Sequence, residues 1–271
     1  MTFSPIVPFG GYSGWAFLKR TLPTQRAAFD TTATLKRNED YFRKNIGKVN
    51  TAENLVADRR LLEVALGAYG LEADINNKFF IKKVLSDGTL KNDALSNRLA
   101  NKQYEKLSAA FGFGDFSTPR NNLSDFADKT LALFKQRQFE AAVGEQNGDY
   151  RIALNAEREL PALAAKSGSE NTLWYTVLGN IPLRRVFEGA LGLPASFGSI
   201  DLDQQLSTMK SRLESRFGSD SVRQFSDPAK VESIIRRFLV QSDVSASGQS
   251  STSSFSALQL LQSGGFRARS Q

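Results

Sequence analysis

The chain has 271 residues, of which 41% are hydrophobic and 23% charged, and its formal net charge is +7. It contains no histidine and no cysteine, which excludes disulfides, thiolate nucleophiles, His or Cys metal sites and any catalytic triad that uses histidine. No apolar run approaches the roughly 18 residues that a transmembrane helix needs, so a soluble globular chain is expected.

The first 50 residues carry most of the excess charge. They hold eight Lys and Arg against three Asp and Glu, whereas residues 51–241 hold 25 against 24. A local excess of this kind is typical of a segment that contacts a partner. We therefore predict that residues 1–50 form a basic partner-docking arm whose binding residues are Lys19, Arg20, Arg26, Lys36, Arg37, Arg43 and Lys44.

Within this arm, prolines and glycines predict an extended lead over residues 1–14, followed by helices over 15–29 and 32–46. The lead lacks the basic and apolar pattern of a cleaved secretory signal. The alternative to a docking arm is that both helices pack their aromatic residues on the body and leave the cations in water.

The rest of the chain is dominated by helical periodicity. Asn50 and Glu53 have the spacing of a capping box, which predicts a helix that begins there and ends at Gly70 in the left-handed conformation. Asp201 and Asp227 are predicted N-caps of later helices. Further helices are expected over residues 74–85, 93–111, 124–146, 149–165, 172–178, 183–191, 202–217 and 228–241, so the predicted fold class is all-α.

An internal duplication is indicated by a segment that recurs after 122 residues. Residues 58–71 and 180–193 are identical at six of fourteen positions. The identical pairs are Leu61 and Leu183, Val64 and Val186, Gly67 and Gly189, Ala68 and Ala190, Gly70 and Gly192, and Leu71 and Leu193. Gly192 is therefore expected to end its helix in the left-handed conformation, as Gly70 does. Two shorter matches follow in the same order. We therefore predict two similar helical lobes joined by long helices, with a first lobe and connecting helices over 51–168, a second lobe over 169–241, and a loose Ser- and Gly-rich tail over 242–271.

The sequence offers few residues for chemistry. The run from Lys78 to Lys83 mixes basic and aromatic residues as a single-strand nucleic-acid surface would. Packing of Phe79, Phe80 and Ile81 in the core, with the lysines in water, is the favoured interpretation. No phosphate loop or dinucleotide fingerprint is present, and no carboxylate pair stands out from ordinary helix capping. No enzyme activity and no cofactor are expected.

The segments at Leu55–Leu71 (LVADRRLLEVALGAYGL), Phe80–Leu85, Asn97–Phe113, Leu191–Phe197 and Phe225–Leu239 together resemble a family of unknown function found in alphaproteobacteria, whose members are typically encoded among flagellar genes. The resemblance covers most of residues 15–241. It implies an all-α fold and a flagellar setting, with no catalytic residues to carry over.

The resulting expectation is a non-enzymatic structural or interaction protein of flagellar assembly or function. Its partner would be a flagellar protein, and it would be cytoplasmic or exported with the flagellar apparatus. The alternative is a basic helical protein that binds nucleic acid, which the near-neutral body makes the less favoured of the two.

Overall fold

In the computed structural model, which describes residues 3–245, every regular element is a helix and no strand occurs in that range. The predicted all-α fold class is confirmed. The α-helices are α1 (Gly11–Asp30), α2 (Ala33–Asn45), α3 (Ala52–Ala57), α4 (Arg59–Tyr69), α5 (Lys78–Asp87), α6 (Leu95–Arg98), α7 (Gln103–Phe111), α8 (Phe126–Gln146), α9 (Gly148–Ala164), α10 (Glu170–Gly179), α11 (Ile181–Leu191) and α12 (Leu202–Phe217). A last helix spans residues 228–245.

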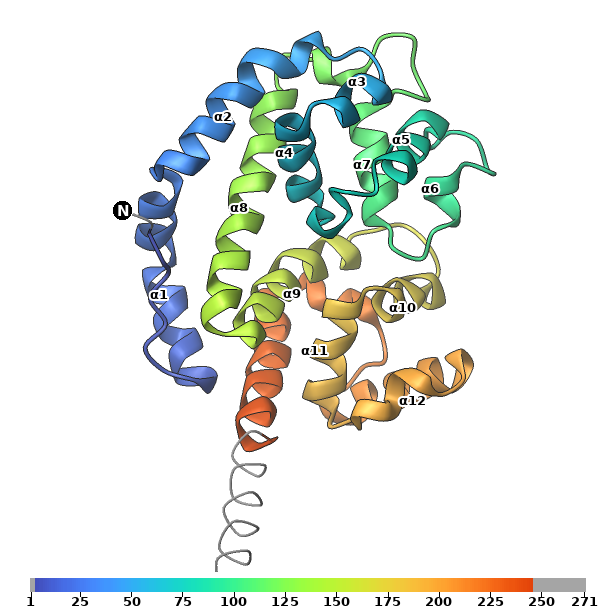
Figure 1. Ribbon diagram of the computed structural model, residues 1–271. Helices are drawn as coiled ribbons and strands as arrows, with labels where there is room; N and C mark the ends of the chain where they lie inside the picture. Colours follow the sequence, from blue (N-terminus) through green and yellow to red (C-terminus); the bar gives the residue numbers. More distant parts are fainter. Residues whose placement is uncertain (1–2, 246–271) are drawn as a thin grey trace, which may run out of the picture.

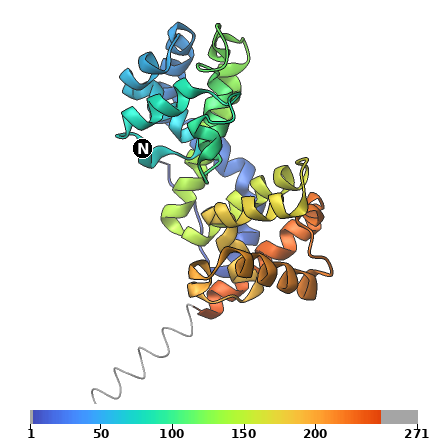
Figure 2. The same cartoon turned by 90° about the vertical axis from the view of Figure 1, so that its right-hand side faces the viewer.

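The helices build two lobes, each with a core of its own (Figures 1 and 2). The first core takes buried residues from α2, α3, α4, α5, α7 and the first half of α8. The second takes them from α1, the second half of α8, α9 to α12 and the helix over 228–245. Helix α8 serves both, because Phe134 lies in the first core and Phe139 in the second. Helix α8 therefore runs through both lobes.

The N-terminal helices follow the same division. Trp15 and Leu18 of α1 are fully buried in the second core, whereas Phe42 of α2 is fully buried in the first. The Tyr12 hydroxyl donates to Glu232 Oε1 at 2.9 Å, so α1 is tied to the last helix, 220 residues away in sequence. Trp15 and Phe42 thus pack on the body, as the alternative to a docking arm expects, whereas Phe9 is 59% exposed.

The observed lobes divide the chain at a different place from the predicted boundaries. The expected boundary at residues 168 and 169 falls within the second core, which already receives Phe139, Tyr150 and Leu160. The change from one core to the other occurs inside α8, between Phe134 and Phe139. Residues 242–245 continue the last helix, and the remainder of the predicted tail, 246–271, lies outside the described residues.

Helices α4 and α11, which carry the matching segments, have the same local design. Asp58 and Asn180 cap their first turns by accepting backbone N–H groups. Gly70 and Gly192 end them in the left-handed conformation, with φ of 72° and 68°. In both, the N–H two residues after the helix donates to the carbonyl oxygen five residues earlier, from Leu71 to Leu66 and from Leu193 to Glu188. The predicted left-handed helix ends are confirmed, while the duplication itself stays a prediction.

Several helices differ in detail from the prediction, and the single helix expected over residues 93–111 is divided into α6 and α7. Helix α1 begins at Gly11 rather than Trp15, and it includes Gly14, where a Cβ would clash with the Phe9 carbonyl oxygen and the Tyr150 hydroxyl. The helix expected to begin at Asn50 is capped by Thr51 instead, whose side chain accepts from the Asn54 N–H. That helix is also interrupted at Asp58, which caps α4 and divides one expected helix into α3 and α4.

Candidate functional site

The predicted binding residues on α1 are not equally free. Lys19 forms an ion pair with Glu157 of α9 and lies over the Trp15 ring. Arg26 packs its guanidinium over the ring of Phe139, 5.7 Å from the centroid. Arg20 is exposed and lies beside Phe17 of the same helix. Two of the three cations therefore hold α1 against the body, and Arg20 alone faces solvent.

The predicted residues on α2 divide in a similar way. Arg43 pairs with Glu39 of its own helix and with Asp128 of α8, so it joins the two helices. Lys36, Arg37 and Lys44 are exposed and form no ion pair within the described residues. A pocket of about 350 Å³ between α1, α2 and α8 brings Arg26 and Arg43 together beside Asp30, Asp128 and Lys135. Its opposite charges balance closely, so it offers no strong site for either sign of ligand.

A basic surface forms around Tyr41 on the outer side of α2. Arg37, Tyr41 and Lys44 follow one another at helical spacings of four and three residues, which places them on one face. Arg60 of α4 joins them: its guanidinium lies 3.8 Å from the centroid of the Tyr41 ring and donates to the Arg37 carbonyl oxygen at 3.1 Å. We call Arg37, Tyr41, Lys44 and Arg60 the α2 patch.

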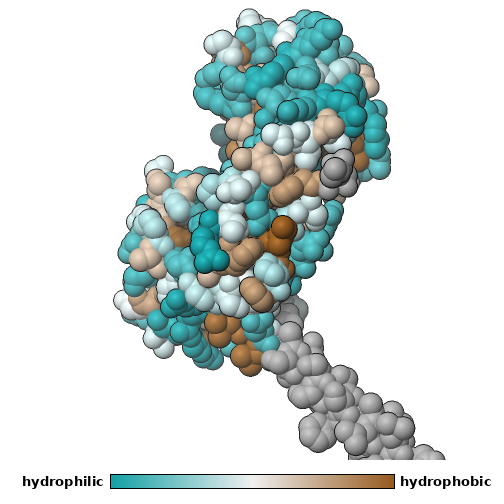
Figure 3. All heavy atoms as spheres, turned by 90° about the vertical axis from the view of Figure 1, so that its left-hand side faces the viewer, coloured by the Kyte–Doolittle hydropathy of each residue, from teal (hydrophilic) through white to brown (hydrophobic). Residues whose placement is uncertain are grey.

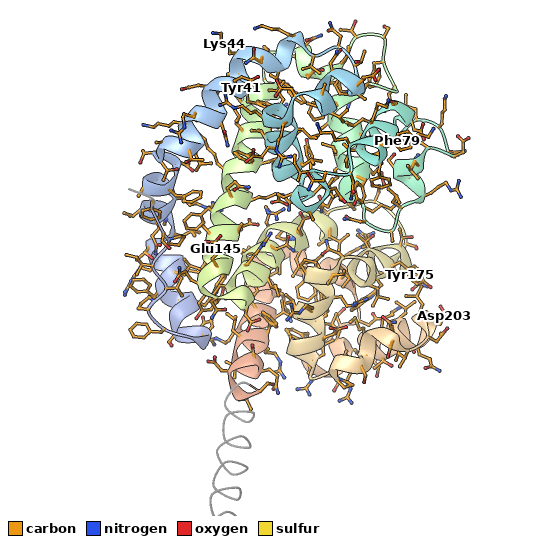
Figure 4. All side chains as sticks on the ribbon, viewed as in Figure 1. Tyr41, Lys44, Phe79, Glu145, Tyr175 and Asp203 are labelled. Carbon is orange, nitrogen blue, oxygen red and sulfur yellow. The ribbon has the colours of Figure 1, made fainter. Side chains whose placement is uncertain are left out.

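The geometry of the α2 patch is fixed by one carboxylate. The Tyr41 hydroxyl donates to Asp58 Oδ2 at 2.7 Å, and this hydrogen bond raises the pKa of Tyr41. Asp58 also caps α4, so it positions both Tyr41 and the helix that carries Arg60. Figure 4 shows Tyr41 and Lys44 on α2, and the upper lobe on this side is mostly hydrophilic (Figure 3). The patch thus presents three cations on a flat polar surface.

The expectation for the run from Lys78 to Lys83 is wrong for one residue. Phe79 is 80% exposed, although Ile81 is fully buried and Phe80 packs edge to face on Tyr104. Helix α5 begins at Lys78, and its buried face consists of Ile81, Val84 and Leu85, which turns Phe79 to solvent. In Figure 4, Phe79 lies on the side of the first lobe away from Lys44. A helical wheel restricted to the α5 bounds would have identified it.

A cluster of charges lies where α7, α8 and α9 meet between the lobes. Arg158 of α9 binds Glu140 of α8 with two hydrogen bonds, Nε to Oε1 at 3.0 Å and Nη2 to Oε2 at 3.1 Å. Glu159 accepts Lys106 of α7 at 3.0 Å and also pairs with Arg158. Burial raises the pKa of Glu159, but these cations outweigh burial and hold it below the ordinary value of 4.5.

This cluster is not predicted from the sequence, because its members come from three different helices. Its signal is weak but real: Glu140 and Glu159 are charged residues on the buried faces of α8 and α9, where they break the apolar pattern. Charged residues are almost never buried unless they are paired. A glutamate on the buried face of each of two adjacent long helices predicts that each one pairs with a cation from a neighbouring residue or helix.

In residues 3–245, no group of three or more His, Cys, Asp or Glu side chains is arranged to hold a metal ion. Across the same range, none of the helices combines the length and the apolar character needed to span a membrane.

Comparison with known proteins places the chain by fold and family. No curated protein matches it. The crystal structure of protein AGR_C_984 from Agrobacterium tumefaciens, determined by a structural genomics consortium, matches with a TM-score of 0.71 and 22% identity over 88% of this chain and 97% of that one. That likeness shows a shared fold. The family model described as "Protein of unknown function (DUF1217)" matches residues 68–231, more than half of the sequence, and the chain therefore belongs to the DUF1217 family.

Proposed function

We propose that this chain is a non-catalytic interaction protein that serves flagellar assembly or function and binds an acidic partner protein through the α2 patch. The observation that carries the proposal is that Arg37 and Lys44 are exposed without an ion pair in the described residues, while Arg43 on the same helix is paired twice. Cations that face solvent on one side of a helix attract acidic surfaces and speed their association.

The arrangement around Tyr41 favours a protein partner. Tyrosine and arginine are enriched among the residues that contribute most to interfaces, and Tyr41 and Arg60 are held in place by Asp58 before any partner binds. A preorganised surface loses less conformational entropy on binding. The flagellar setting rests on the family resemblance of the sequence segments described above, and the non-catalytic role rests on the missing histidine and cysteine.

The interaction is tested with the variant Arg37→Glu/Lys44→Glu. Tagged full-length protein is used to capture partners from the native cell, and bound proteins are identified by mass spectrometry. The matched control is Arg212→Glu/Arg216→Glu, which reverses two exposed charges on α12. We expect a partner that is lost with the α2 variant and retained with the control. Equal retention by both variants contradicts binding through the α2 patch.

The flagellar role is tested separately by deleting the gene. We expect swimming to be impaired while growth in liquid stays unchanged, and complementation with the wild-type gene to restore swimming. The Arg37→Glu/Lys44→Glu variant should fail to complement, and the α12 control should complement. Normal motility with normal filaments in the deletion strain contradicts the flagellar proposal without bearing on the interaction surface.

A second candidate function, nucleic-acid binding, is favoured by the exposure of Phe79. An aromatic ring that is 80% exposed between Lys78 and Lys82 offers a base-stacking surface with nearby cations. Lys82 and Lys83 are paired with Glu53 and Asp87, which lowers the free positive charge there. A mobility-shift assay decides the matter: phosphate-driven binding must weaken steeply with salt and must decrease in Phe79→Ala. No shift at low salt excludes this function.

A further inference from the structure

A small cavity lies between the lobes, next to the charge cluster. Its volume is about 150 Å³. The first lobe supplies Gly70 at the end of α4 and the residues that precede α7, and the second lobe supplies the turn between α10 and α11. Its lining consists of Gly70, Asn101, Gln103, Arg137, Asn155, Gly179, Asn180, Ile181 and Pro182, and no carboxylate is among these residues.

Two donors at this cavity have no hydrogen-bond partner among residues 3–245. The Nε of Arg137 and the Nδ2 of Asn155 are both buried without a hydrogen bond. The remaining bonds of Arg137 are weak, because its Nη2 reaches Gln103 Oε1 and Glu159 Oε1 only at 3.4 Å. Buried donors are normally satisfied by protein, water or a ligand, and an arginine has five donors to satisfy.

The charge of Arg137 is also poorly balanced. Its nearest carboxylate, Glu159, is shared with Lys106 and Arg158, both of which approach it more closely. The Arg137 side chain is 14% exposed, so water screens it little. Burial and the neighbouring charge of Arg158 lower the pKa of Arg137 despite Glu159, Glu140 and Glu72. The arginine thus lacks an anion of its own.

We propose that this cavity is a binding site for a small oxyanion, a carboxylate or a phosphate group, held by the Arg137 guanidinium and the Asn155 side-chain amide. A planar guanidinium binds both groups through paired hydrogen bonds. The volume equals that of about five water molecules at ~30 Å³ each, which admits one such group and excludes a nucleotide. Gly70 has no side chain to displace the guanidinium, which lies against its backbone.

The site joins the lobes through its ligand. Arg137 belongs to α8, Asn155 to α9, and the opposite rim is formed by Asn180 and Ile181 at the start of α11. Backbone N–H groups at a helix start add positive potential on that side. The Ala100 carbonyl oxygen would lie 3.5 Å from a Cβ placed at Gly179, so the two rims already approach each other closely. A bound anion would therefore contact residues of both lobes.

The test uses the full-length protein with sodium phosphate and sodium acetate as separate probes, at constant ionic strength maintained with sodium chloride. Binding is followed by the chemical shifts of the Arg137 Nε–H and Asn155 side-chain amide resonances and by the midpoint of thermal unfolding. We expect both resonances to shift and to saturate below about 50 mM of one probe. At a probe concentration ten times its Kd, we expect Tm to rise by about 3–6 °C. The probe that saturates at the lower concentration identifies the ligand as phosphate or carboxylate.

Two variants and a control complete the test. Asn155→Asp keeps the Oδ1 that accepts from Arg158 at 3.0 Å, removes the amide donors and adds a fixed negative charge beside Arg137. We expect it to remain folded and to lose the response to either probe. Arg137→Met should lose the response as well, and Arg151→Met, an exposed arginine of α9, should keep it. Absence of saturable shifts in the wild type, or an unchanged response in Asn155→Asp, overturns the proposal.

Discussion

Gly67 of α4 lies directly against the ring of Phe134 of α8: a Cβ at position 67 would come within 2.8 Å of two ring carbons. The two helices therefore pack more closely than any side chain at position 67 allows. We expect Gly67→Ala to destabilise the protein by about 1–3 kcal/mol, since overpacking forces neighbouring groups to move. Urea denaturation followed by circular dichroism measures the change.

The second lobe repeats this contact between Gly189 of α11 and Phe238 of the last helix, where a Cβ would come within 2.7 Å of the ring. Gly189→Ala should therefore destabilise the protein by a similar amount. The control is Gly148→Ala, because nothing lies within 4 Å of a Cβ there. If all three variants change the free energy of unfolding equally, close packing at Gly67 and Gly189 is not the reason for glycine.

Replacing either left-handed glycine, Gly70 or Gly192, with valine should destabilise the protein. A β-branched residue at positive φ costs about 1–2 kcal/mol or more. Gly70→Val should be worse than Gly192→Val, because a Cβ at 70 collides with Arg137 whereas the nearest atom at 192 is Arg216 Nη2 at 3.8 Å. Thermal unfolding of both variants gives the comparison. An order reversed from this one would show that Arg137 yields freely to a side chain at position 70.

Removal of residues 1–49 should destabilise the whole protein. Trp15 and Leu18 are fully buried in the second core and Phe42 in the first, and loss of a buried large aromatic residue alone costs about 3–5 kcal/mol. A fragment that begins at Asn50 should therefore aggregate or melt at a lower temperature, as seen by calorimetry. A fragment with an undiminished cooperative melt would restore the view of residues 1–50 as a separable docking arm.

Glu159 should make stability dependent on pH in the acid range. Its pKa is lowered in the folded state, so its contribution is fully present above the unfolded value near 4.5 and is lost as pH falls through the lower folded value. Glu159→Gln should lower Tm at pH 7 and show a smaller further decrease between pH 4.5 and pH 3 than the wild type. Glu145→Gln, an exposed position labelled in Figure 4, is the control and should follow the wild type.

Much of the fold could be predicted because the signals are local. The left-handed ends at Gly70 and Gly192 and the caps at Asp201 and Asp227 depend on a few adjacent residues, and the structure confirms all four. The interruption at Asp58 was missed because its polar side chain interrupts no apolar stripe in sequence. It ends α3 by capping the helix that follows, which only the turn geometry reveals.

The candidate sites depend on longer distances. The exposed cations of α2 are visible in the sequence, but Arg60, which completes the α2 patch, comes from another helix. The number of charges in the segment also does not distinguish Arg43 from Lys44. Arg43 pairs with Asp128, which is 85 residues away, whereas Lys44 has no ion pair in residues 3–245. The unequal roles of neighbouring cations are set by tertiary packing, which composition does not record.

The tie between Tyr12 and Glu232 sets an order for folding during synthesis. The first core is complete once α8 has emerged from the ribosome, since its buried residues lie between Leu35 and Phe134. The second core needs both Trp15 and Phe238, so α1 must wait for nearly the whole described chain. Until then, the first lobe is folded while the apolar face of α1 stays exposed. Exposed apolar surface of this kind in a nascent chain is what chaperones protect.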